Sequence, residues 1–246
     1  MDGDPLVPFD ARKPSAADRE LHAEILDIFP LAGVLVRENR EFLARAVGYV
    51  VRYGATQFIE VGSGLPASPG THEIADLASP GARVAYVDND PVVISHVSAL
   101  LARPGRVAAV AGDVRCPQDI LASPELMAPI DISKPFGVIL DYVPPAQAAE
   151  IVAEFQRAMP AGSFLILSIG MNNDTPDPAR DVIKAYRAAA VHLHSREQVA
   201  GYFAGLEIVA PGLTEARYWR PDRPQPVSAP RPGDILAGVG RKTHPG

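Results

Sequence analysis

The sequence has a single cysteine, Cys116, among its 246 residues. One thiol excludes an intramolecular disulfide and any zinc site built from several cysteines. Long apolar runs are also missing, and the first residues form neither a basic segment nor an apolar one, so we expect no membrane span and no secretion signal. These absences favour a cytoplasmic protein that does not bind a membrane.

Positive charge is scarce as well. Lys and Arg number 23 against 29 Asp and Glu, which gives a net charge of -6 and a pI of about 5.5. Proteins that bind nucleic acids need clustered cations to neutralise phosphates, whereas the arginines here are dispersed along the chain. We therefore expect no nucleic-acid partner.

Hydrophobic residues make up 47% of the chain and follow two different periods. Helical spacing predicts helices over residues 15–29 and 37–53, so residues 1–54 are expected to form an N-terminal arm and a helical cover or lid. From residue 55 to residue 246, short apolar runs alternate with amphipathic helices. That alternation is typical of a parallel sheet covered on both faces, so the sequence predicts a doubly wound α/β fold.

The predicted strands are short, apolar and rich in β-branched residues, and they cover residues 57–61, 83–87, 107–110, 136–140, 163–168, 206–209 and 234–241. The predicted helices between them cover residues 71–77, 91–102, 146–159 and 195–203. Asp90 is suited to cap one helix, with Pro91 in its first turn, and Ser195 with Gln198 forms a capping box for another. Five prolines exclude a ladder strand over residues 221–232 and predict a long connection.

Ligands bind open parallel sheets outside the carboxyl ends of the strands. Gly62 and Gly64 follow the first predicted strand and would let the backbone approach a ligand closely. Asp88 ends the second strand, where it could accept hydrogen bonds from a ribose diol, and Asp113 follows the third, where it could meet an adenine amino group. Together these residues predict a nucleoside ligand.

The turn at residues 62–64 is compatible with two kinds of nucleoside. Ala67 stands where the dinucleotide fingerprint has its third small residue, so the spacing alone would allow NAD. However, Pro66 and Pro69 remove backbone amides that a pyrophosphate would use, and Glu60 places negative charge near the site. A ligand with an ammonium group and a sulfonium, such as S-adenosylmethionine, suits this acidic site better.

Several motifs resemble those of known families. Residues 58–64, 87–88 and 112–114 resemble the class I S-adenosylmethionine-dependent methyltransferases. More narrowly, the Tyr-Val-Asp-Asn-Asp-Pro-Val-Val run at residues 86–93 resembles the actinobacterial methyltransferase family formerly catalogued as a domain of unknown function, as do residues 39–43, 64–66, 71–73, 195–197 and 211–213. The likeness covers residues 13–241.

The resemblance implies a Rossmann-like, seven-stranded sheet of order 3-2-1-4-5-7-6 with the final strand antiparallel. It also implies that the cofactor contacts residues at four strand ends. Glu60, Gly62, Ser63 and Gly64 would hold the methionine part, Asp88 the ribose hydroxyls, Asn89, Asp113 and Val114 the adenine, and Asp141 the amino group or the sulfonium.

Catalytic residues are less constrained by the sequence. A general base is needed only for a hydroxyl or ammonium acceptor, and Tyr142, His192 and His194 are candidates by their positions in loops. Tyr142 could instead form an aromatic wall for the acceptor. No carboxylate stands at helical spacing from His192 and His194, so no metal site is expected. His72 could either contact the ligand carboxylate or pack structurally.

The sequence therefore predicts an S-adenosylmethionine-dependent methyltransferase that acts on a small molecule of secondary metabolism by in-line methyl transfer. The acceptor would be enclosed by residues 169–174 and by the helix at 15–29. The alternative is a protein that binds S-adenosylmethionine without transferring its methyl group, either in a regulatory role or as a non-methylating cyclase. A homodimer could form through the N-terminal helices.

Overall fold

The computed structural model describes residues 31–141, 143–171, 193–229, 231 and 233–243. The predicted helix at 15–29, Tyr142, His192 and residues 172–174 lie outside the described residues. Within the described residues, no helix combines the length and the apolar composition that crossing a membrane requires.

One mixed sheet organises the chain, with strand order β3-β2-β1-β4-β5-β8-β6 and with β7 paired to β8. Its strands are β1 (Gln57–Val61), β2 (Arg83–Asp88), β3 (Val107–Ala111), β4 (Gly137–Leu140), β5 (Phe164–Gly170), β6 (Glu207–Ile208), β7 (Thr214–Glu215) and β8 (Ile235–Arg241). The first five are parallel to one another, whereas β8 runs antiparallel to β5, β6 and β7. If the two-residue strand β7 is left aside, this is the predicted order, and the antiparallel final strand is confirmed.

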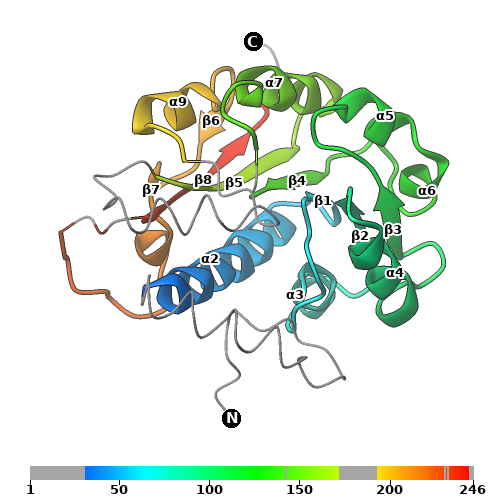
Figure 1. The fold of residues 1–246 in the computed structure, drawn as a ribbon, viewed down its shortest axis with the longest axis horizontal. Coiled ribbons are helices and arrows are strands. Elements are labelled where there is room, and N and C mark those ends of the chain that lie inside the picture. Colours follow the sequence, from blue (N-terminus) through cyan, green and yellow to red (C-terminus); the bar gives the residue numbers. More distant parts are fainter. Residues whose placement is uncertain (1–30, 142, 172–192, 230, 232, 244–246) are drawn as a thin grey trace.

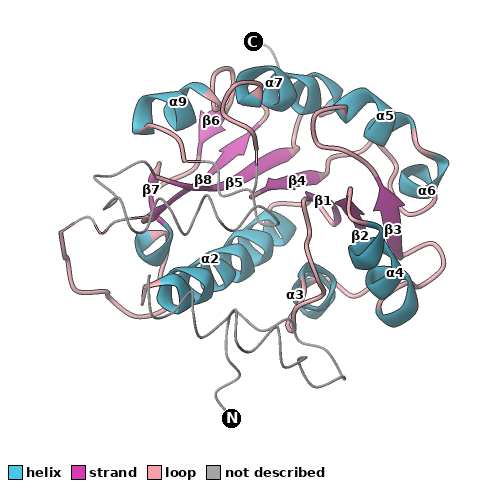
Figure 2. Ribbon diagram, in the orientation of Figure 1, coloured by secondary structure: helices cyan, strands magenta, loops and turns pink. Residues whose placement is uncertain are grey.

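Helices cover both faces of the sheet, as predicted (Figures 1 and 2). One layer contains α2 (Ala32–Arg52), α3 (Thr71–Ala78) and α4 (Pro91–Leu100), and the other contains α5 (Pro117–Ala122), α6 (Pro124–Met127), α7 (Ala148–Ala158) and α9 (Arg196–Gly201). The helix predicted from residue 37 begins at Ala32. The predicted caps are confirmed, because Asp90 accepts a hydrogen bond from the Val92 amide and Ser195 forms a capping box with Gln198.

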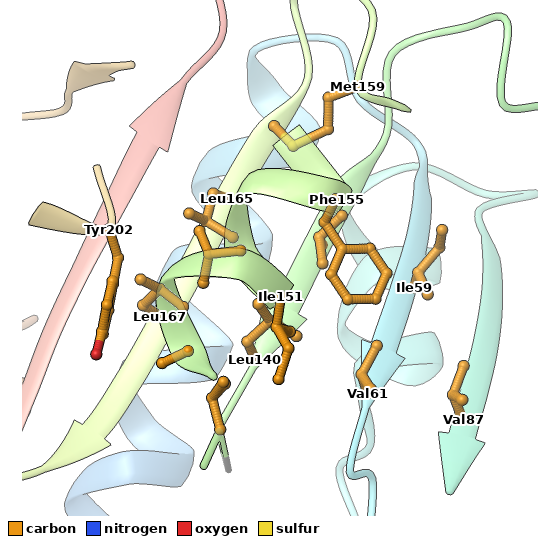
Figure 3. Packing of buried hydrophobic residues seen from close by; sticks show 14 of the residues in the cluster. Ile59, Val61, Val87, Leu140, Ile151, Phe155, Met159, Leu165, Leu167 and Tyr202 are labelled. Atoms are coloured by element: carbon orange, nitrogen blue, oxygen red, sulfur yellow. The ribbon is translucent and has the colours of Figure 1, made fainter. Parts of the chain in front are cut away.

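Each face of the sheet has its own hydrophobic core. Ile59 and Val61 of β1 pack with Ile151 and Phe155 of α7, which Figure 3 shows from close by. Phe58 points to the opposite face, where it belongs to the core that includes α2. Because side chains alternate along a strand and both faces are covered, the strands are almost continuously apolar.

Helix α2 runs antiparallel to β1 and β4, so its first half reaches the carboxyl edge of the sheet. Near the end of α2, the Val50 side chain lies against the first residue of β4, at 3.6 Å from an ideal Cβ on Gly137. Asn39 is eleven residues earlier, about 16 Å along the helix axis. Since β4 covers about 13 Å between Gly137 and Asp141, Asn39 comes level with Asp141.

A buried ionic cluster ties the 221–232 connection to this helix. Asp234, only 1% exposed, pairs with Arg217 at 2.7 Å and with Arg231 at 2.8 Å. Arg231 also pairs with Glu38 of α2. At the other end of the connection, the Arg220 guanidinium lies 4.4 Å from the centre of the Tyr49 ring. Buried charges are tolerated when they are paired, and these pairs anchor both ends of the connection on the helix or beside it.

Candidate functional site

The Gly-rich turn after β1 folds back over the end of β2. Gly62 and Gly64 have φ angles of 73° and 61°, in the left-handed region that favours glycine. The backbone amides of Gly62 and Ser63 both donate to the Val87 carbonyl, at 2.9 and 3.2 Å. The sequence therefore places Gly62, Ser63 and Gly64 correctly at the carboxyl edge of the sheet.

Asp88, the last residue of β2, connects two loops at this edge. Its Oδ2 accepts a hydrogen bond from the Gly64 amide at 2.9 Å, and its Oδ1 accepts one from the Asp90 amide at 2.9 Å. A carboxylate oxygen has two lone pairs, so each oxygen can still accept a bond from a ligand hydroxyl. Asp88 thus holds the glycine turn in place, a role that sequence reasoning missed.

Asn89, Asp113 and Val114 form the rim beyond β2 and β3. Asn89 is exposed, whereas Asp113 and Val114 are half-buried. Arg115 donates to both carboxylate oxygens of Asp113, and these hydrogen bonds hold the pKa of Asp113 below its ordinary value. Asp113 is therefore an ionised acceptor that already has a cationic neighbour.

Two half-buried acids, Glu60 and Asp141, lie at this edge, near the carboxyl ends of β1 and β4. Burial raises the pKa of Glu60 to about 8, and the nearby Asp141 charge adds to the rise while a Thr71 hydrogen bond opposes it. Burial also raises the pKa of Asp141 to about 6, against hydrogen bonds from Ser168 and Asn39. The Ser168 hydroxyl donates to Asp141 at 2.7 Å.

The second carboxylate oxygen of Glu60, Oε2, is buried and has no hydrogen-bond partner. A buried acceptor without a donor is costly, so this atom is suited to a ligand that carries N–H groups or positive charge. The apolar neighbours Ile59 and Val61 already indicate that Glu60 lies in a buried strand, where an acid needs a partner. The participation of Asn39 was not predicted, because it depends on how α2 packs across β4.

His72 packs structurally. It is 4% exposed, its Nδ1 lies 2.8 Å from the Tyr86 hydroxyl, and its backbone amide donates to the same hydroxyl at 3.0 Å. Burial lowers the pKa of His72. The ring therefore helps to fix the start of α3 against β2, which is the structural one of the two predicted roles.

His194 joins three segments of the chain. Its Nε2 lies 2.9 Å from the Val143 carbonyl, its Nδ1 lies 2.9 Å from the Tyr202 hydroxyl, and its backbone amide donates to the Gly170 carbonyl. The side chain is fully buried and both ring nitrogens have partners. This geometry corrects the expectation of a general base at His194, because neither nitrogen is available to take a proton from an acceptor.

Removing the Tyr202 hydroxyl tests this structural role. We expect Tyr202→Phe to lower the free energy of unfolding by about 1 kcal/mol, because a buried nitrogen of His194 loses its partner. Chemical denaturation measures the change. Tyr53→Phe, at a tyrosine that is 53% exposed, is the control and should change stability by less than about 0.5 kcal/mol. Equal stability of the two variants would contradict the assignment.

In the described part of the chain, no group of three His, Cys, Asp or Glu side chains is arranged to hold a metal ion. His192 lies outside the described residues, and the predicted absence of a metal stays a prediction.

The sheet order, the glycine turn and the acids at four strand ends define a Rossmann-like protein of the methyltransferase class. The chain belongs to the S-adenosyl methyltransferase family, whose model matches residues 12–243. Its cofactor is S-adenosylmethionine. A comparison with curated proteins gives no match.

Solved structures agree with this assignment. A candidate methyltransferase from Thermobifida fusca YX is 33% identical with a TM-score of 0.84, over 93% of this chain and 89% of that one. A DUF574 family protein from Streptomyces avermitilis MA-4680 is 32% identical with a TM-score of 0.82, over 94% and 92%. The magnesium protoporphyrin IX methyltransferase of Synechocystis PCC 6803, solved with bound SAH, shares the fold at 11% identity, with a TM-score of 0.52 over 96% and 91%.

The residues at this edge fit the cofactor of the family. The buried Glu60 Oε2 without a partner matches a ligand with an ammonium group. The turn at residues 62–64 lets a ligand approach its backbone, because Gly64 has no side chain in the way. The space beside Gly64 is open: a Cβ placed there would meet nothing within 4 Å.

Proposed function

We propose that this protein transfers the methyl group of S-adenosylmethionine to a small-molecule acceptor of secondary metabolism. The observation that carries the proposal is the pair of half-buried acids with raised pKa values, Glu60 and Asp141, beside the glycine turn. A cationic ligand offsets the cost of burying these carboxylates, whereas an anionic dinucleotide would add to it.

The roles proposed for the chain follow the carboxyl edge of the sheet. The turn at residues 62–64 positions the methionine part, with Glu60 and Asp141 beside its cationic groups. Asp88 accepts from the ribose hydroxyls, and Asn89, Asp113 and Val114 border the adenine. The bound cofactor supplies a methyl group already activated by the sulfonium. The protein therefore has to align the acceptor with that methyl group and exclude water.

The acceptor pocket is proposed to lie over the ends of β4 and β5, where residues 1–54 provide the cover. Tyr142 and His192 remain candidates for a general base, which only a hydroxyl or ammonium acceptor requires. An acceptor that is already nucleophilic at neutral pH needs positioning alone.

Calorimetric titration with S-adenosylmethionine and with S-adenosylhomocysteine tests the site. We expect both to bind to the folded protein, whereas NAD should not. Incubation with S-adenosylmethionine and small-molecule extracts, followed by mass spectrometry, then tests the transfer. New products heavier by one methyl group, formed together with S-adenosylhomocysteine, support the proposal. Tight binding without any such product would favour the non-transferring alternative, and absence of binding would contradict both.

A further inference from the structure

Asn39 of α2 lies beside Asp141 at the carboxyl edge of the sheet, although it comes from the helix that covers the sheet. Its side chain hydrogen-bonds the Asp141 carboxylate and so lowers the pKa of that acid, against the effect of burial. Its carbonyl oxygen, Oδ1, is buried and has no hydrogen-bond partner. The antiparallel course of α2 over β4 brings Asn39 level with the end of the strand.

Three acceptor groups from three elements therefore neighbour one another, because Asn39 hydrogen-bonds Asp141 and the Asp141 charge acts on Glu60. Glu60 Oε2 comes from β1 and Asn39 Oδ1 from α2, and neither has a donor. The Asp141 carboxylate follows β4 and accepts from Ser168, but its oxygens have further lone pairs. Buried acceptors are nearly always satisfied in native proteins, so this group calls for a ligand with several N–H donors.

Two groups of the cofactor carry N–H donors, the adenine amino group and the α-ammonium group. The adenine amino group is uncharged, and the adenine is assigned to Asn89, Asp113 and Val114. The α-ammonium group carries three N–H donors and a positive charge, which suits one amide oxygen beside two acids.

We propose that Asn39 is a cofactor-specificity residue whose Oδ1 accepts a hydrogen bond from the α-ammonium group of S-adenosylmethionine, beside Glu60 and Asp141. The cover helix then contacts the cofactor directly. Binding selects for the amino-acid part of the cofactor through α2, while the nucleoside part is held by the loops after β1, β2 and β3.

Calorimetry on Asn39→Leu tests this contact with three named probes. S-Adenosylmethionine and S-adenosylhomocysteine both carry the ammonium group, and 5′-methylthioadenosine lacks it. Asn39→Leu should weaken the first two by the same factor, about ten- to a hundredfold, because a hydrogen bond to a charged group is lost. Its affinity for 5′-methylthioadenosine should stay within about twofold of the unmutated protein. Asn39→Asp, which keeps an acceptor at this position, should bind S-adenosylmethionine more tightly than Asn39→Leu does.

Other results would overturn the proposal in recognisable ways. Equal weakening of all three probes would show that Asn39 acts through the fold. A larger loss for S-adenosylmethionine than for S-adenosylhomocysteine would place Asn39 at the sulfonium, and unchanged affinities would remove it from the site. Arg37→Leu, at an exposed position of the same helix, is the matched control for α2. Titration of the unmutated protein separately tests whether the cofactor binds at all.

Discussion

Asp88→Ala is expected to weaken S-adenosylmethionine binding by about a hundredfold. The substitution removes a charged acceptor from the ribose, for which about 1.5–3 kcal/mol is typical, and it also releases the glycine turn. In the unmutated protein, Gly64 and Asp90 both donate backbone amides to this carboxylate. Calorimetry measures the affinity, and thermal unfolding should show a parallel loss of stability.

Two further variants separate the contributions of Asp88. Asp88→Asn keeps one acceptor oxygen and should therefore lose less affinity than Asp88→Ala. Asp90→Ser is the matched control, because serine also caps helices and the Asp90 side chain accepts only from the Val92 amide in the described contacts. Its affinity should be unchanged. Unaltered binding by Asp88→Ala would contradict the assignment of Asp88 to the ribose.

Glu60→Gln is expected to stabilise the cofactor-free protein at high pH. The pKa of Glu60 is raised to about 8 by burial, so the folded state binds a proton that the unfolded state has already lost above its ordinary pKa of 4.5. The contribution of Glu60 to stability is therefore present at low pH and is lost as the pH rises through about 8. Relative to the unmutated protein, the free energy of unfolding of Glu60→Gln should increase by about 2–4 kcal/mol between pH 5 and pH 9.

Cofactor binding should depend on pH in the opposite sense. An ionised Glu60 attracts the cationic cofactor, so the affinity of the unmutated protein should rise as the pH increases through about 8, and Glu60→Gln should flatten this rise. Titrations at several pH values measure both curves. Glu207→Gln, at an exposed strand residue, is the control. The same pH dependence in Glu60→Gln and in the unmutated protein would refute the proposed role of Glu60.

The fold was predictable where local patterns determine it. Burial on both faces makes the strands apolar, and Asp90 and Ser195 mark helix starts by local hydrogen bonds. By contrast, β7 and the 3-10 helix Ala216–Tyr218 were not predicted. Elements of two or three residues show no periodicity, and β7 forms here because it pairs with residues 236–237 of β8.

The site was predictable from the strand ends, but its internal contacts were not. Glu60 and Asp88 follow from their positions in β1 and β2. The partners of His194 are Val143 and Tyr202, and the first of these is 51 residues away in the sequence, so only the packed chain shows that the ring is structural. Asn39 was missed for the same reason, because a residue on a cover helix acquires its role from the strand beneath it.

The 221–232 connection, anchored through Arg220 at one end and Arg231 at the other, also offers a practical attachment point. Residues 222–225 are exposed, while the neighbouring Pro226 and Ser228 contact Tyr218. Exposed loop segments of this kind tolerate insertions. A reporter peptide or a fluorescent label placed between Arg223 and Gln225 should therefore leave the cofactor site at the carboxyl edge undisturbed. The same chain could then be immobilised or followed optically while ligands are screened.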